Sequence, residues 1–204
     1  MPKIWTVLAA MVAVVGLAGV TPGFAQSAPQ PTPDDRILGK ADAPVTIFEY
    51  ASFTCPHCAD FDANVLPKIK ADWIDTGKAR LIFRDFPLDQ AAVRAAILAR
   101  CAPPDQYYAF VDALFHSQTT WAQNGKVDEA LNKLAKVSGM SDEQFAACMK
   151  DEAAQKRVLD SRLQAEQQYK VESTPTFFIN GVMVVGAQPY PEFEKALNQA
   201  ASKS

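Results

Sequence analysis

Apolar and polar positions repeat with two different periods along the chain, and each change of period marks an expected element. The β-branched and aromatic run VTIFEY (45–50) predicts a strand. From Cys55 onward the period becomes helical, and Pro67 should kink that helix. The apolar positions of its buried face are Phe61, Val65, Ile69 and Trp73. ARLIF (79–83) then predicts a second strand, so the chain opens as strand, helix, strand.

Residues 89–170 carry helical spacing and contain no convincing strand. Prolines 103 and 104, the Asn124–Gly125 pair and Gly139 divide the region into several helices. Ser141, followed three residues later by Gln144, is a capping box that predicts the start of one of them. We therefore expect an all-helical subdomain here.

Strands return near the C-terminus. TFFI (176–179) and VMVV (182–185) are joined by Asn180 and Gly181, a two-residue hairpin signal, and a last helix begins near Pro191. The predicted order βαβ, helices, ββα resembles an α/β thioredoxin fold interrupted by an all-helical insertion. Its parts would be residues 37–88, the insertion 89–170, and residues 171–204.

The first 25 residues have the pattern of a cleavable signal peptide. A positive start at Lys3 precedes the apolar run Ile4–Val20, and small residues stand at Gly23 and Ala25. The alternative is a retained membrane anchor, because that run is near the lower limit for a spanning helix. The proline-rich residues 26–36 should form an exposed, flexible tail. Export would place the mature chain where disulfides persist.

Composition excludes several classes of partner. The chain has 204 residues, 49% of them hydrophobic, and a formal charge of −3. It lacks a dense run of Lys or Arg, so we expect no nucleic acid and no anionic membrane surface as partner.

The stretch TCPHC places Cys55 and Cys58 one helical turn apart at the expected start of a helix. Pro56 suits the first helical turn. The helix N-terminus should stabilise a thiolate at Cys55, and His57 adds a donor or a positive charge beside it. A pair whose reduced form is stabilised is a strong oxidant. A zinc site and a structural bridge remain the alternatives, although further metal ligands are scarce because the chain has two histidines.

The segments FEYASFTCPHC and STPTFFING, with the helical insertion between them, resemble the DsbA-like thiol oxidoreductases of the bacterial periplasm. The resemblance covers about residues 37–200. It implies that Cys55 is the exposed nucleophile and Cys58 the buried resolving thiol. It also implies a periplasmic location and reoxidation by a DsbB-type, quinone-linked membrane partner. We expect no cofactor.

Three further residues take expected roles from the same resemblance. Glu49 matches the family's buried acid, a proton acceptor beneath the buried cysteine; alternatively it is a strand-end glutamate that reaches water. Thr174–Pro175 matches the cis-proline dipeptide facing the active site, where an extended substrate could pair with the backbone. The threonine differs from the valine of the family's best-known oxidant and also occurs in isomerases and reductants.

Cys101 and Cys148 are expected to form a stabilising disulfide. An exported protein with an even number of cysteines favours the bridge, which would be worth about 4 kcal/mol in the chain-entropy model. The alternative is two separate buried thiols. His116 should lie on a helix surface or line a groove, and we predict no metal site.

Together these features predict a dithiol oxidase that gives its Cys55–Cys58 disulfide to reduced, exported polypeptides, and we expect it to be a monomer. One rival is a disulfide isomerase or reductase on the same fold. Another is a non-catalytic periplasmic binding or chaperone module that keeps CPHC as an inert bridge.

Overall fold

The computed structural model describes Met1 and residues 28–123 and 125–203. Apart from Met1, the signal peptide predicted over residues 1–25 lies outside the described residues. No helix within the described ranges is both long and apolar enough to cross a membrane.

Within the described residues, five strands form one mixed sheet in the order β1-β3-β2-β4-β5. The strands are β1 (Ile37–Gly39), β2 (Val45–Ala51), β3 (Ala79–Asp85), β4 (Thr176–Ile179) and β5 (Val182–Val185). β2 pairs in parallel with β3 and antiparallel with β4. Every residue of β2 is buried, which explains why its sequence is a run of mostly apolar residues and does not alternate with polar ones.

β1 is a strand that the sequence did not predict. It has three residues, too few to show an alternating pattern, and it forms because it pairs antiparallel with the edge of β3. The predicted thioredoxin order is otherwise present, with β2, the first helices and β3 followed by the helical insertion and then β4, β5 and α9 (Tyr190–Ala201).

The helix predicted to run from Cys55 to Trp73 is divided into three segments. These are α1 (Pro56–Asn64), α2 (Leu66–Ile69) and the π-helical turn η1 (Lys70–Ile74). Pro67 has no N–H to donate to the carbonyl of Ala63, and its ring crowds that carbonyl, so the helix breaks just before it, near the predicted kink. The π turn is closed by the Asp75 N–H, which donates to the Lys70 carbonyl at 2.8 Å.

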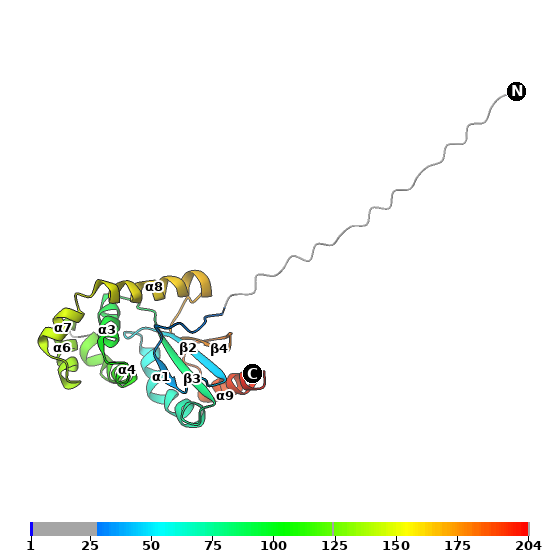
Figure 1. Ribbon diagram of the computed structural model, residues 1–204, viewed down its shortest axis with the longest axis horizontal. Helices are drawn as coiled ribbons and strands as arrows, with labels where there is room; N and C mark the ends of the chain where they lie inside the picture. Colours follow the sequence, from blue (N-terminus) through cyan, green and yellow to red (C-terminus); the bar gives the residue numbers. More distant parts are fainter. Residues whose placement is uncertain (2–27, 124, 204) are drawn as a thin grey trace.

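The insertion consists of helices that gather beside one end of the sheet, while α8 runs along one sheet face (Figure 1). They are α3 (Gln90–Cys101), α4 (Tyr107–His116), α5 (Gln118–Ala122), α6 (Val127–Val137), α7 (Asp142–Cys148) and α8 (Glu152–Tyr169). The capping box at the start of α7 is confirmed, with Ser141 and Gln144 each bonding the other's backbone. The short helix α5 was not predicted.

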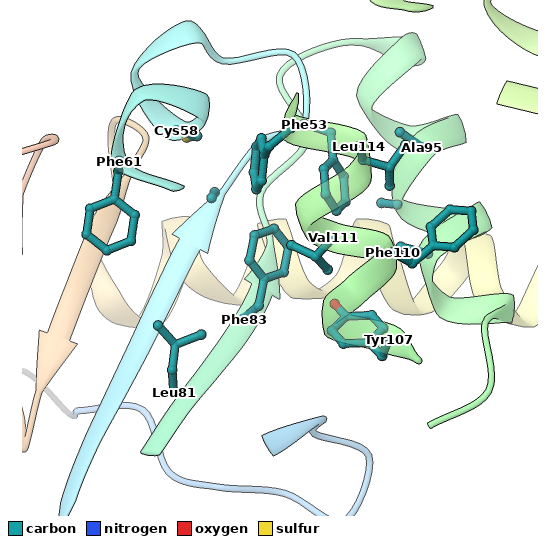
Figure 2. Close-up of a cluster of buried hydrophobic side chains, with 14 of the residues drawn as sticks. Phe53, Cys58, Phe61, Leu81, Phe83, Ala95, Tyr107, Phe110, Val111 and Leu114 are labelled. Carbon is teal, nitrogen blue, oxygen red and sulfur yellow. The ribbon is translucent and has the colours of Figure 1, made fainter. Parts of the chain in front are cut away.

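The two faces of β2 enter different apolar clusters. Phe48 and Tyr50 pack in a cluster with Ala165 and Tyr169 of α8. The alternate residues of β2, which point to the other face of the sheet, join the main core, which extends to α1, α4 and α9. Figure 2 shows side chains of α4, among them Val111, directed toward β3. Glu49 lies on this second face, so its carboxyl group is directed into the main core.

The hairpin prediction is confirmed. Asn180 and Gly181 have φ values of +43° and +89°, the left-handed conformation that a two-residue type I′ turn requires.

The prediction of an exposed, flexible tail over residues 26–36 is wrong in part. The side chains of residues 30–34 are exposed, but Pro29 is buried. The Arg84 guanidinium donates to the Gln30 carbonyl at 2.6 Å and to the Asp35 carboxylate at 2.7 Å. The Asp35 and Arg84 side chains are only 9% and 7% exposed, so a buried ion pair holds this segment against the sheet.

Candidate active site

Cys55 is the N-cap of α1, in the turn that follows β2. Its N–H donates to the Ser52 carbonyl at 3.0 Å, and its own carbonyl accepts from the Cys58 N–H at 3.1 Å. Pro56 lies in the first turn, and both Pro56 and His57 are exposed. The prediction that the cysteine pair opens a helix at the end of the first long strand is therefore confirmed.

The two cysteines are present as free thiols, and both are buried. Cys58 is fully buried, as expected, but Cys55 is only 5% exposed, so the expectation of an exposed nucleophile is wrong for this reduced state. The Thr174–Pro175 segment lies over Cys55, whose thiol donates to the Thr174 carbonyl at 3.4 Å.

The pKa values of the two thiols are driven in opposite directions. The pKa of Cys55 is lowered to about 5, mainly by a hydrogen bond from the Cys58 side chain and against an opposing effect of burial. The Thr174 side chain and the backbone N–H groups of Cys58 and His57 add to this lowering. Burial and the neighbouring Cys55 raise the pKa of Cys58. At neutral pH the reduced site therefore holds a thiolate at Cys55 and a protonated thiol at Cys58, which donates to it.

The peptide bond between Thr174 and Pro175 is cis. The Thr174 hydroxyl is buried and has no hydrogen-bond partner in this state. Because a thiolate accepts hydrogen bonds, that hydroxyl is positioned to donate when Cys55 loses its proton, which agrees with its lowering of the Cys55 pKa. The Pro175 carbonyl accepts from the Gly186 N–H at 2.8 Å, which fixes the segment to the hairpin.

Glu49 is 2% exposed, so the alternative of a strand-end glutamate in water is wrong. Its Oε1 atom has no hydrogen-bond partner, and burial, together with the charge of Asp62, raises its pKa well above the ordinary value. The carboxyl group also acts on the nearby resolving thiol, because its charge raises the pKa of Cys58. Glu49 and Asp62 line one cavity of about 380 Å³, which is large enough to hold water.

Gln118 is a site residue that sequence reasoning missed. Its side chain is 6% exposed, and Nε2 donates to the carbonyls of Phe53 and Cys55 at 2.8 and 3.0 Å. The helical insertion thus fixes the active-site turn through α5. No local pattern marks this residue, because its two partners lie more than 60 positions earlier in the chain.

Cys101 and Cys148 are joined by a disulfide that links the end of α3 to the end of α7. The structure therefore contains the expected bridge, and the alternative of two separate buried thiols is wrong.

His116 lies at the end of α4 with its side chain 59% exposed, as expected for a helix surface. Its Nδ1 is 3.2 Å from a carboxylate oxygen of Asp112 and 3.8 Å from one of Asp62, a residue of α1. Burial, followed by the charge of Asp112, raises the pKa of Asp62 to about 6, while His116 acts in the opposite direction. Nothing in the sequence groups these three residues, because 50 positions separate Asp62 from Asp112.

A family profile described as thioredoxin matches residues 31–199. A putative protein-disulfide oxidoreductase of Rickettsia bellii is 31% identical over 150 residues, which cover 73% of this chain and 58% of that protein. Disulfide bond formation protein D of Bacillus subtilis is 29% identical, covering 80% of this chain and 75% of that one. The crystal structure of alpha-DsbA1 from Wolbachia pipientis is 33% identical with a TM-score of 0.79, covering 85% of this chain and 94% of that one.

The chain spans 54% to 58% of the length of the Rickettsia relatives it matches. The Wolbachia structure, by contrast, is covered almost completely.

Proposed function

The chain belongs to the thioredoxin family and, within it, to the DsbA-like thiol:disulfide oxidoreductases, and we propose that it is a dithiol oxidase for exported, partly unfolded polypeptides. The observation that carries the proposal is the opposite direction of the two thiol pKa values, with that of Cys55 lowered to about 5 and that of Cys58 raised. A stabilised thiolate at Cys55 favours the reduced enzyme, so the disulfide form is readily reduced by substrates.

The reaction begins with the Cys55–Cys58 disulfide. A substrate thiolate attacks Sγ of Cys55, the Cys55–Cys58 bond breaks, and Cys58 leaves as a thiolate that takes up a proton. A second substrate thiolate then attacks the substrate sulfur of the mixed disulfide, and Cys55 leaves as a thiolate. The substrate loses two electrons and two protons; the enzyme gains both electrons and one proton, and the other proton goes to solvent.

Each step of this mechanism has a supporting residue. Glu49 lies beneath the buried thiol with a raised pKa, so its carboxylic acid can supply the proton that Cys58 needs. The low pKa of Cys55 makes it a good leaving group in the second step. The Thr174 backbone lies against the Cys55 thiol, where an extended substrate segment can add to it as a strand.

Completion of a catalytic cycle requires removal of the two electrons. We propose reoxidation by a DsbB-type, quinone-linked membrane partner, a periplasmic location reached through the predicted signal peptide, and a monomeric enzyme. The Cys101–Cys148 bridge supports this location, because disulfides form and persist chiefly in oxidising compartments.

Thiol trapping of the purified protein across a series of glutathione redox buffers tests the direction of electron flow. We expect the Cys55–Cys58 pair to be far more oxidising than thioredoxin, whose potential is about −270 mV, and the Cys101–Cys148 pair to resist reduction. A first pair as reducing as thioredoxin would instead identify a reductase.

A second experiment separates catalysis from binding. A Cys55→Ser variant should lose all oxidase turnover of a reduced model substrate while keeping its fold, measured by thermal unfolding. If the variant retains full activity, the CPHC pair is an inert bridge and the protein is a binding module.

A further inference from the structure

Asp62, Asp112 and His116 bring three metal-ligating side chains together at the contact between α1 and α4, with one donor atom from each within 4.8 Å of the others. Asp112 and His116 stand four residues apart on α4, which places both on one face of that helix. Nδ1 of His116 is 3.2 Å from the Asp112 carboxylate and 3.8 Å from Oδ2 of Asp62. Donors about 2.1 Å from a shared tetrahedral ion lie roughly 3.4 Å apart, so small side-chain rotations suffice.

The burial of Asp62 distinguishes this cluster from an ordinary surface group of acids. Its side chain is only 5% exposed, and Oδ2, the oxygen directed at His116, has no hydrogen-bond partner. A buried carboxylate oxygen without a partner is costly unless a cation or water satisfies it. Oε1 of Glu49, which lines the same cavity, is a second buried oxygen without a partner.

Competing cations near the cluster are engaged elsewhere. Lys70 also lines the cavity, but its Nζ binds the carboxylate of Asp75 at 2.7 and 2.8 Å. Among the ion pairs of the described residues, Asp62 and Asp112 pair with His116 alone.

We propose that Asp62, Asp112 and His116 bind one divalent transition-metal ion, with Zn²⁺ the ion that suits this donor set. One imidazole and two carboxylates are borderline to hard ligands, which fit Zn²⁺ better than Ca²⁺ or Cu⁺. The site offers three protein ligands and leaves a fourth position for water. Nδ1 of His116, which lies 3.1 Å from the Asp112 carbonyl, can bind the ion only in the tautomer whose proton is on Nε2.

Such an ion would link α1, which begins within the CPHC motif, to α4 of the insertion. The sequence predicted no metal site because further ligands near CPHC are scarce, and because 50 positions separate Asp62 from Asp112 in the chain.

Isothermal titration calorimetry with ZnCl₂ at pH 7 tests the proposal. The protein should carry no polyhistidine tag, and its Cys55–Cys58 pair should be oxidised so that the thiols cannot bind the ion. We expect one saturable site per chain. Asp112→Asn and His116→Gln change exposed residues that do not threaten folding, and each should weaken binding by more than about tenfold, a loss that even outer-shell changes can cause. Asp62→Asn, which keeps the side-chain shape, should do the same.

The matched controls are Asp60→Asn, an exposed acid of α1, and His57→Gln, the other histidine, neither of which should change the affinity. Because the chain has two histidines, the imidazole resonances of His116 should also shift on addition of ZnCl₂ while those of His57 stay in place. Absence of a saturable site would overturn the proposal. Binding that survives in Asp62→Asn would also overturn it, because the buried carboxylate would then take no part.

Discussion

The thiol of Cys55 donates to the backbone carbonyl of Thr174 at 3.4 Å, which joins two segments 119 residues apart. The same residue carries a buried hydroxyl without a hydrogen-bond partner, and its side chain lowers the Cys55 pKa. The backbone of Thr174 thus meets the protonated thiol, whereas its side chain favours the thiolate. Substitution can separate the two effects, because Thr174→Val removes the side-chain hydroxyl and keeps the backbone carbonyl.

Thr174→Val should raise the pKa of Cys55 by about one unit, since one hydrogen bond to a charged group is lost. Thr174→Ser keeps the hydroxyl and is the matched control. The pH dependence of alkylation by iodoacetamide in the reduced protein measures both values. An unchanged midpoint in the valine variant would show that the hydroxyl does not reach the thiolate.

The thiolate of the reduced protein should titrate with a midpoint near pH 5. Absorbance at 240 nm measures this titration, which should be absent from Cys55→Ser.

The stability of the reduced protein should also depend on this thiolate. The folded pKa of Cys55 lies below the ordinary thiol value of 9.0, so the thiolate stabilises the folded, reduced state. This contribution is complete above pH 9 and is lost as the pH falls through 5. Denaturation of the reduced protein at several pH values should follow that course, whereas the oxidised protein lacks the titrating thiol.

Glu49→Gln should make the protein more stable at neutral pH. Burial raises the folded pKa of Glu49, so ionisation opposes folding, and the loss of stability grows as the pH rises above the ordinary value of 4.5. The difference between variant and parent should therefore be small at pH 4 and larger at pH 7, measured by urea unfolding. A difference independent of pH would mean that the carboxyl group is not the cause.

The same Glu49→Gln variant should slow the first chemical step, because it cannot supply a proton to Cys58. Stopped-flow fluorescence with a reduced peptide measures this step. A rate equal to that of the parent would remove Glu49 from the proposed proton transfer.

Gln118→Ala should destabilise the protein by about 1–3 kcal/mol, because the buried carbonyls of Phe53 and Cys55 lose the side-chain donor that they share. Thr119→Ala, an exposed change on the same short helix, is the control and should have little effect. We also expect the Gln118 variant to shift the pKa of Cys55, because the active-site turn is no longer fixed. Equal stability of the two variants would contradict this role.

Replacement of both Cys101 and Cys148 by alanine should lower the free energy of unfolding by about 4 kcal/mol, the value of closing a loop with a sequence separation of 47. The bridge is outside the CPHC site, so the thiolate titration of Cys55 should stay in place. Urea unfolding and alkylation of the same sample check the two expectations together. A shift of the Cys55 titration would show that the bridge is coupled to the redox site.

The sequence by itself determined the features that depend on local periodicity and turn chemistry. The apolar run of β2, the left-handed Asn180–Gly181 turn, the Ser141 capping box and the helix start at Cys55 each involve residues within a few positions of one another. Their order along the chain was enough to predict a thioredoxin fold with a helical insertion. Local sequence could also predict that the long first helix breaks near Pro67, because proline lacks the N–H that a helix interior needs.

Only the tertiary structure decided which distant residues meet at the site. The burial of Glu49 beside Asp62, the bonds from Gln118 to the active-site turn, and the position of Thr174 over Cys55 all depend on how the elements pack. A pKa responds to burial and to charges a few ångströms away, whatever their separation in sequence. The sequence therefore identified the two cysteines as a redox pair, whereas the environment that makes their pKa values diverge exists only in the folded chain.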